Sequence, residues 1–231
     1  MFHKSTTSLT LWFWAIFLMS STRCGISAKQ LEREIGVTYK TAWRMFNVIR
    51  DMLGQDTEPP LSGAVEVDET YVGGKARAYP KRSRAEHAAR KVPVFGAVER
   101  GGRVVARVMT DALAPSIKSN MRQYVLPASV VYTDDANVYR MDLDIRREYP
   151  NHHRIQHHTR IYVDGDVHTQ TIDGFFGLIK NALRGVHHGV SRKHLQGYLN
   201  EYTFRWNHRD EATPLFWAIL DQVRKDRLAV D

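Results

Sequence analysis

Residues 65–72, VEVDETYV, place acidic side chains inside a segment that otherwise suits a buried β-strand. Val, Thr and Tyr favour a pleated, half-buried surface, whereas Asp and Glu are disfavoured there. Moving a carboxylate toward a low dielectric is costly unless a cation, a proton or several hydrogen-bond donors compensate it. The fold must therefore bring compensating groups to this strand, and this requirement constrains the structures that the chain can adopt.

The charge balance favours a polyanionic partner. The 231 residues can form one good core with room for a small accessory domain. They include 33 Lys and Arg against 25 Asp and Glu, for a net charge of +8, which favours nucleic acid ahead of an anionic membrane. Cys24 is the only cysteine, which excludes an internal disulfide and a Cys-based zinc site and fits a reducing cytoplasm.

The most apolar stretch, residues 9–19, is LTLWFWAIFLM. It is too short to span a bilayer, which takes roughly 20 apolar residues. Only Lys4 is a firm positive charge ahead of it, and no A-x-A-like cleavage site follows, so an export signal is disfavoured. We expect a buried helix, no membrane association and a cytoplasmic location.

Residues 1–55 are predicted to form a helical region that contains a helix-turn-helix. Ser27 and Gln30 have the spacing of a capping box, and Gly36 supplies a turn before a second helix from about residue 38. The apolar face of that second helix is predicted to hold Ala42, Trp43, Phe46, Ile49 and Leu53. Its outward N-terminal half carries the candidate DNA-binding residues Tyr39, Lys40, Thr41 and Arg44. An ordinary helical hairpin with solvated basic residues is the alternative.

Two further segments divide the chain. Residues 56–64 hold two prolines and few apolar side chains, which is typical of a linker. Residues 75–91 carry many basic side chains against the single acid Glu86, so they suit contact with phosphates, although a merely solvated loop fits as well. The candidate DNA-binding residues of this stretch are Lys75, Arg77, Lys81, Arg82 and Arg84.

The order of the remaining elements predicts an α/β fold. After the strand at 65–72 come a hairpin of strands at 94–98 and 104–108, a helix at 116–124 and a strand at 130–133. An irregular, His-rich stretch at 152–168 precedes helices at 171–184, 191–206 and 214–224, the second of which is expected to pack on the sheet. Three antiparallel strands, then a helix and a strand able to pair with the first, is the order of a ribonuclease H-like mixed sheet flanked by helices. Residues 65–231 are predicted to form this catalytic domain with its C-terminal helices.

Three distant carboxylates can converge on such a sheet. Asp68 lies in mid-strand, Asp134 at the end of a later strand and Asp173 in the first turn of a helix. Gathered carboxylates repel one another unless hard cations neutralise them, and Mg²⁺ or Mn²⁺ suits oxygen ligands. Two such ions, about 3.5–4 Å apart, can assist displacement at a phosphodiester. The adjacent acids are poorer candidates: Glu66, Glu69 and Asp135.

The helix predicted at 171–184 carries a second indication. Asp173 and Lys180 fall on the same side, about 10 Å apart at roughly 1.5 Å of rise per residue, and Arg184 continues that side. The opposite, apolar face holds Ile172, Phe175, Phe176, Ile179 and Leu183. A metal-bound carboxylate and a lysine two turns further on can bracket a phosphate backbone. An amphipathic helix with solvated charges is the alternative.

Taken together, six ordered blocks resemble bacterial insertion-sequence transposases of the DDE class, in the branch with Asp-Asp-Glu/Asn/His followed by Lys. The blocks are VEVDETYVGGK, KVPVFGAVERGGRV, VYTDDANVY, HTQTIDGFFGLIK, GVHHGVSRKHLQGYLNEYTFRWNHR and GISAKQLEREIGVTYKTAWRM. The resemblance implies metal-dependent nicking of DNA at terminal inverted repeats, followed by attack of the freed 3′-hydroxyl on target DNA. It assigns the catalytic positions to Asp68, Asp134, Asp173 and Lys180, with a homo-oligomer acting on paired ends.

The sequence departs from its relatives in two respects. Asp173 stands where related sequences more often have Glu, and relatives generally begin with a Cys-rich zinc ribbon that has no counterpart in this sequence. These departures motivate a truncated DNA-binding remnant without catalysis as one alternative. A ribonuclease H-like, structure-selective nuclease on the same sheet is another.

Overall fold

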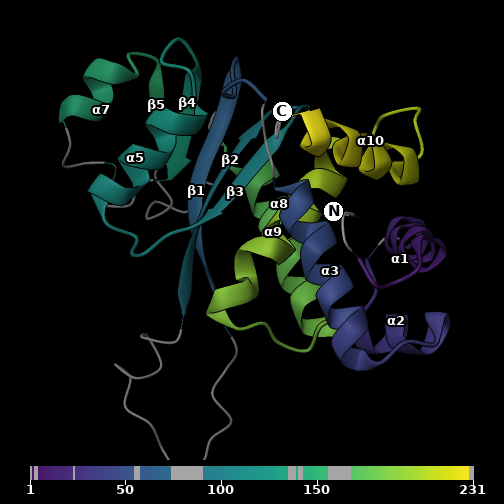
Figure 1. Ribbon diagram of the computed structural model, residues 1–231. Coiled ribbons are helices and arrows are strands. Elements are labelled where there is room, and N and C mark those ends of the chain that lie inside the picture. The colour runs from purple at the N-terminus through teal and green to yellow at the C-terminus, as the bar shows by residue number, and fades with distance from the viewer. Residues whose placement is uncertain are drawn as a thin grey trace, which may run out of the picture. The chain divides into compact units, whose positions relative to one another are not determined.

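The structure is a computed structural model, shown in Figure 1, that describes residues 2, 5–22, 24–54, 58–73, 91–134, 139, 143–155 and 168–228. The side chains of 143, 144, 146 and 224–228 lie outside this description. The chain divides into two compact units. One comprises residues 58–180, and the other combines residues 1–57 with residues 181–231.

The first unit is built on a five-stranded sheet. Its strands are β1 (Ala64–Val72), β2 (Val92–Glu99), β3 (Val104–Val108), β4 (Val130–Asp134) and β5 (His152–Ile155). They lie in the order β3-β2-β1-β4-β5. The pairs β1–β2 and β2–β3 are antiparallel, whereas β1–β4 and β4–β5 are parallel. This mixed sheet, with β4 returning to pair with β1, confirms the predicted ribonuclease H-like fold.

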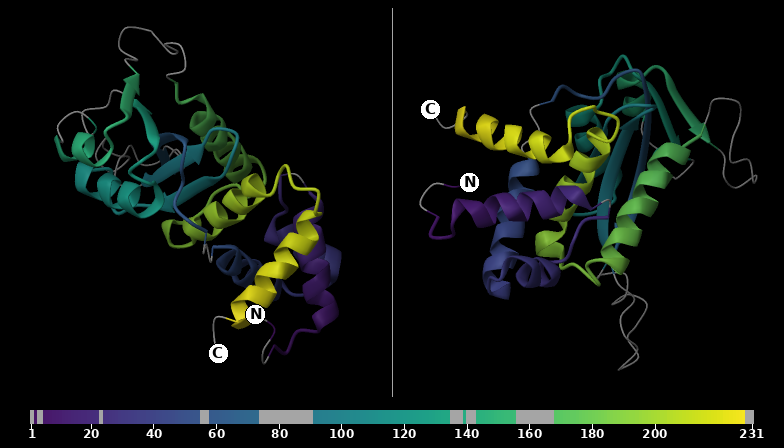
Figure 2. Two further views of the ribbon diagram at one scale, coloured as in Figure 1. Left: turned by 90° about the horizontal axis from the view of Figure 1, so that it is seen from above. Right: turned by 90° about the vertical axis from the view of Figure 1, so that its right-hand side faces the viewer.

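Alternation along β1 assigns its side chains to the two faces of the sheet. Val65 and Val67 point to one face and are fully buried in a core with helix α5 (Ala114–Tyr124) and with Tyr149, just after α7 (Leu143–Glu148). Glu66 and Asp68 point to the other face, against which α8 (Gln170–Gly185) packs. Figure 2 shows the sheet between α5 and α7 on one side and α8 on the other.

A glycine lets α8 approach the sheet. Gly96 of β2 is the direct partner of Asp68 across the β1–β2 ladder, so both positions face α8. A Cβ atom at position 96 would lie 2.5 Å from Phe176 Cζ and 2.9 Å from Ile172 Cδ1, closer than packed atoms approach. The apolar face of α8 therefore rests on backbone beside Asp68.

One expectation about this unit is wrong. Residues 152–155 were expected to begin an irregular stretch, but they form the parallel edge strand β5, which pairs with β4 from Val131 to Asp134. Only Ile155 of its four side chains is buried, so the segment has no alternating apolar pattern to reveal it. The pairing comes from the neighbouring strand, and a hydrogen bond of 2.9 Å between Thr133 Oγ1 and His152 Nε2 adds to it.

The second unit is helical. It contains α1 (Leu9–Ser21), α2 (Ala28–Ile35), α3 (Tyr39–Leu53), the 3₁₀ helix η2 (Arg192–His194), α9 (Leu195–Asn207) and α10 (Leu215–Leu228). Ser27 caps α2 by accepting a hydrogen bond from Gln30 N, and Gly36, with φ 68°, ends it. Thr38 caps α3 in the same way through Thr41 N. The two predicted helices and their turn are thus confirmed. Within the described part of the chain, no helix combines the length and apolar character needed to cross a membrane.

Two packing expectations for the helical unit need correction. Trp43 was placed on the apolar face of α3, but its side chain is 36% exposed, and Met45 lies in the core instead. Helix α9 was expected to pack on the sheet, whereas its extensive partner is α3. Both outcomes depend on which face of α3 is covered by the neighbouring helices. The sequence of α3 alone does not determine that face.

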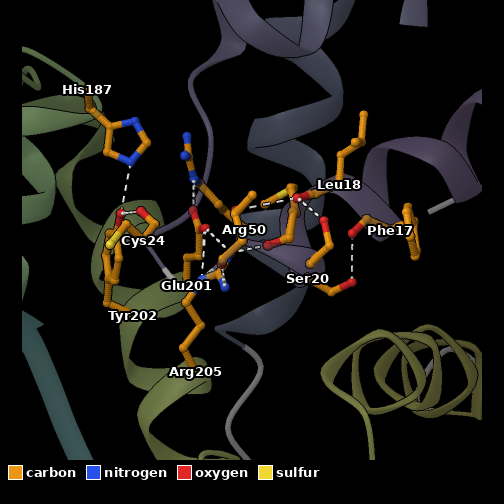
Figure 3. A network of polar contacts seen from close by, with 12 residues as sticks. Phe17, Leu18, Ser20, Cys24, Arg50, His187, Glu201, Tyr202 and Arg205 are labelled. Atoms are coloured by element: carbon orange, nitrogen blue, oxygen red, sulfur yellow. Dashed lines mark hydrogen bonds and ion pairs between the residues drawn. The ribbon is translucent and has the colours of Figure 1, made fainter. Parts of the chain in front are cut away.

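A buried ion network joins these helices (Figure 3). Glu201 of α9 is 1% exposed, and its Oε2 lies 2.8 Å from Arg50 Nε of α3. Arg205 Nη2 lies 2.9 Å from Glu201 Oε1, and Arg205 also donates to the backbone oxygens of Met19 and Thr22. Burial raises the pKa of Glu201, but Arg50 and Arg205 outweigh it and hold the pKa at about 2. The carboxylate therefore ties α9 to α3 and to the end of α1.

Candidate active site

The carboxylate of Asp68 lies at the junction of two strand pairings. Asp68 faces Gly96 across the antiparallel β1–β2 ladder. On its other side β1 pairs in parallel with β4 up to Glu66 and Tyr132, and Asp134 lies two residues beyond Tyr132, as Asp68 lies two residues beyond Glu66. The parallel register therefore brings Asp68 and Asp134 to corresponding positions on neighbouring strands.

Asp173 reaches the same region from α8. It lies in the first turn of that helix, on the exposed side, with Ile172 buried beside it against the sheet. Since Ile172 and Phe176 contact the Gly96 position opposite Asp68, the start of α8 lies over this part of the sheet. Three segments far apart in sequence thus contribute one carboxylate each to one region of the unit.

Burial and the nearby acids perturb the ionisation of Asp68. The pKa of Asp68 is raised to about 8, first because burial disfavours the charge and then because Asp134, Glu69 and Asp173 repel it. A hydrogen bond of 2.8 Å from Glu69 N to Asp68 Oδ1 opposes this rise only in part. In the absence of a cation, Asp68 therefore holds a proton at neutral pH.

Glu69 and Tyr139 extend the acidic cluster. Burial raises the pKa of Glu69, while a hydrogen bond of 2.8 Å from Tyr139 Oη to Glu69 Oε2 lowers it. The pKa of the buried Tyr139 hydroxyl is itself raised well above 10, by burial and then by Glu69. Tyr139 therefore stays protonated and serves as a donor that holds Glu69 in place.

The donor set of this region suits a hard divalent cation. In the described segments, no three His, Cys, Asp or Glu side chains form a group that could hold a metal ion. These acids suit a divalent cation because carboxylates are oxygen donors. The pKa of Asp68, raised to about 8 by burial and by the repelling acids, also means that a nearby positive charge would favour its ionised form. The sharing of metal ions by Asp68, Asp134 and Asp173 remains a prediction.

Glu66 compensates its own burial in a different way. It is fully buried, and its Oε2 accepts hydrogen bonds from the backbone N–H groups of Thr171 at 2.8 Å and Ile172 at 3.0 Å. Its Oε1 lies 2.9 Å from Arg100 Nε and accepts a bond of 3.0 Å from Thr171 Oγ1. His168 Nδ1 lies 3.2 Å from the same oxygen, without hydrogen-bond geometry.

These contacts give Glu66 a positioning role that the sequence did not reveal. The first backbone N–H groups of a helix lack partners within the helix, and the carboxylate supplies them from β1. Arg100 completes the anchor, since it also donates to His168 O at 2.8 Å and lies over the Tyr132 ring. Glu66 thereby fixes the start of α8, and hence Asp173, relative to β1. The signal present in the sequence was a second in-strand acid two residues before Asp68, but the helix residues that it binds, Thr171 and Ile172, lie over 100 residues away.

The remaining predicted residues on α8 lie along its length. Lys180 is half-buried, with its ammonium 5.9 Å from the centre of the Phe176 ring, and Arg184 is exposed in the last turn. Their contact with DNA remains a prediction.

The predicted DNA-binding residues of the helix-turn-helix lie in the first two turns of α3. Tyr39 and Lys40 are exposed, and the Thr41 hydroxyl lies 3.0 Å from Thr38 Oγ1. Arg44 is exposed too, but its Nη2 donates to Thr7 Oγ1 at 2.7 Å, which turns the guanidinium toward the start of the chain. The predicted basic residues Lys75, Arg77, Lys81, Arg82 and Arg84, like Asp135, lie outside the described residues.

Comparisons with known proteins agree on one family. Residues 60–207 match the ISXO2-like transposase domain. A protein in the transposable element ISH50 of Halobacterium salinarum is 33% identical over 223 residues, which cover 88% of this chain and 71% of that protein.

Two solved assemblies contain chains with a distant structural likeness. One is a pre-cleavage Mos1 transpososome, with 11% identity, a TM-score of 0.36 and coverage of 93% of this chain and 77% of that chain. The other is a simian T-cell lymphotropic virus intasome in complex with a PP2A regulatory subunit, with the same identity and TM-score. This match covers 82% of this chain and 64% of that chain, which is less than two thirds of its length. TM-scores this low do not establish a shared fold, so the fold assignment rests on the order and direction of the five strands.

Proposed function

We propose that this chain, which belongs to the family of ISXO2-like transposases, cuts DNA at the ends of its element and joins the freed ends to target DNA. The observation that carries the proposal is the parallel register of β1 and β4 together with the packing of α8 against Gly96, which supports a shared region for Asp68, Asp134 and Asp173. The pKa of Asp68, raised to about 8 by burial and by Asp134, Glu69 and Asp173, agrees with it. Sites where like charges and burial are gathered without a structural need are candidates for catalysis.

Asp68, Asp134 and Asp173 would hold Mg²⁺ or Mn²⁺ through their carboxylate oxygens, with two ions as the expected number. When bound, such ions supply charge neutralisation and activate an attacking oxygen. The residues of the chain do the positioning. Glu66 and Arg100 fix the start of α8, Gly96 lets that helix approach β1, and Tyr139 holds the Glu69 carboxylate by its hydrogen bond.

DNA binding would draw on two groups of residues. Lys180 and Arg184 on α8 would contact the backbone of the strand being cut, and Tyr39, Lys40, Thr41 and Arg44 on α3 would contact the terminal inverted repeat. The stretch with Lys75, Arg77, Lys81, Arg82 and Arg84 would add phosphate contacts. The net charge of +8 supports such a partner, and we expect a homo-oligomer to form on paired DNA ends.

The test is cleavage of duplex DNA that carries the terminal inverted repeats, with and without Mg²⁺ or Mn²⁺. Asp68→Asn keeps the shape of the side chain and removes its charge. It should therefore reduce the rate of cleavage at least ~100-fold and leave DNA binding in a gel-shift assay intact. Asp221→Asn, at an exposed aspartate of α10, is the matched control and should cut normally.

The result also separates the alternatives. Binding without cutting at any metal concentration would refute the catalytic proposal and leave a DNA-binding remnant. Equal cutting of branched substrates without repeats would refute the transposase assignment of the activity and favour a structure-selective nuclease. Undiminished cutting by Asp68→Asn would remove Asp68 from the site.

A further inference from the structure

A cavity of about 300 Å³ lies within the helical unit, beside the helix-turn-helix. One wall comes from the first turns of α2 and α3. The other comes from the segment that joins α8 to η2 and from the start of α9. The side chains that matter here are Lys29, Tyr39, Trp43, His188, His194 and Tyr198.

Aromatic rings dominate the cavity, and two of them are exposed. Trp43 is 36% exposed and meets the His194 ring edge-on, with 4.9 Å between ring centres. Tyr39 is 49% exposed, and the Lys29 ammonium lies 5.9 Å from the centre of its ring. Lys29 also pairs with Glu32 at 2.5 Å, which offsets part of its charge. Trp43 therefore presents part of its ring to the cavity, where it can contact a bound ligand.

The opposite wall is held in an unusual conformation. Among the described residues His188 is the only non-glycine with a positive φ, at 56°, and Gly189 follows with φ 141°. Such conformations are costly and persist where the surroundings impose them. The anchor is the preceding His187, whose Nε2 lies 3.0 Å from Tyr202 Oη, while that hydroxyl donates to Cys24 O at 2.9 Å (Figure 3).

The His187 anchor is itself neutral near pH 7 and has a fixed hydrogen-bond direction. Because the Tyr202 hydroxyl directs its proton to Cys24 O, His187 Nε2–H is the donor to Tyr202. Burial and then Arg50 lower the pKa of His187 to about 4, so the ring is neutral near pH 7. The turn at 188–189 is therefore held by a fixed hydrogen-bond chain, and the cavity exists before any ligand binds.

We propose that this cavity accepts one unpaired nucleotide of the bound DNA, with its base stacked on Trp43. The inference rests on the proposed DNA-binding function and adds a single-stranded subsite to it. Aromatic rings stack on any base, whereas the bases of an intact duplex have their faces covered by neighbours, so only an unpaired base fits this chemistry. The volume suits a single nucleotide, and Lys29 lies where a phosphate could meet an ammonium.

The experiment compares two overhangs on one duplex, using the full chain in EDTA. The first overhang carries adenines, and the second is abasic but has the same number of phosphates. Wild type should bind the adenine overhang about 5- to 100-fold more tightly, the range expected for stacking one base. A 2-aminopurine placed in the overhang should lose fluorescence on binding.

Variants on both walls decide the matter. Trp43→Ala and His194→Ala should each lower the adenine-to-abasic affinity ratio toward one, and Trp43→Phe should retain most of it. Trp217→Ala, at a tryptophan that is 57% exposed on α10, is the matched control and should keep the ratio. A general weakening of duplex binding would lower both affinities and leave the ratio in place.

A wild-type ratio of one, or a ratio that Trp43→Ala leaves unchanged, would overturn the proposal. Neither result depends on cutting, because the assay contains no divalent ion. Failure here would leave the cleavage test of Asp68 untouched, and an inactive enzyme could still show the stacking preference.

Discussion

Replacing Asp68 with Asn should stabilise the metal-free protein while destroying its proposed activity. The pKa of Asp68 is about 8 in the folded chain, against an ordinary value of 3.8. Between these two values the unfolded chain has released the proton and the folded chain still holds it, so the free energy of unfolding falls as the pH rises through this window. Asn carries no charge and can still accept the hydrogen bond that Glu69 N makes to Asp68 Oδ1.

The magnitude follows from the width of the window. The 3.2 pH units between 3.8 and 7 correspond to about 4.4 kcal/mol at about 1.36 kcal/mol per unit. Asp68 is half-buried, and solvent screening and relaxation of the acids reduce this upper bound to about 1–3 kcal/mol. The gain should therefore be near zero at pH 4 and largest near pH 8.

Urea unfolding in EDTA, followed by circular dichroism at pH 4 and pH 7, measures this gain. Asp221→Asn supplies the control for removing one exposed negative charge. Adding Mg²⁺ should raise the melting temperature of wild type more than that of Asp68→Asn, because a ligand stabilises only a state that binds it. A variant no more stable than wild type at pH 7 would show that the acids around Asp68 do not repel it as inferred.

The remaining predictions concern the groups that position the site and hold the helical unit together. Glu66→Ala should lower the free energy of unfolding by about 3–5 kcal/mol, because Arg100 and two helix N–H groups lose their carboxylate. Glu66→Gln keeps an acceptor, so it should lower the free energy of unfolding less. In hydrogen exchange, Glu66→Gln should also partly restore the protection of the α8 amides. Equal losses in the two variants would contradict the anchoring role. Gly96→Ala should lower the free energy of unfolding by about 1–3 kcal/mol, because the new Cβ would meet Phe176. Gly174→Ala on α8, where a Cβ has no neighbour within 4 Å, should be neutral or stabilising by up to ~1 kcal/mol. Reversed effects of the two variants in thermal melts would refute the packing argument. Glu201→Gln should lower the free energy of unfolding by about 3–5 kcal/mol at pH 7. In wild type, the Glu201 pKa of about 2 stabilises the fold above pH 4.5, and this gain is lost as the pH falls toward 2. The variant should therefore lose less stability than wild type between pH 4.5 and 2, and an equal loss would rule this out.

Local physics explains why much of the architecture was readable from the sequence. The capped start of α2, its glycine end and the cap of α3 depend on residues within one or two turns. Likewise, the apolar face of α8 and the β2–β3 hairpin repeat at the periods of a helix and a strand. The order of these elements then led to the ribonuclease H-like sheet.

Long-range burial explains what the sequence could not determine. Strand β5 exists because β4 pairs with it, although only Ile155 among its side chains is buried. Residues Glu66 and Asp68 are alike in sequence, as in-strand acids two positions apart. Tertiary structure makes Glu66 the anchor of α8, through helix N–H groups more than 100 residues away, and brings repelling acids near Asp68. The energy of a buried charge depends on which groups the fold brings near it, and that is decided only once the sheet and α8 have come together.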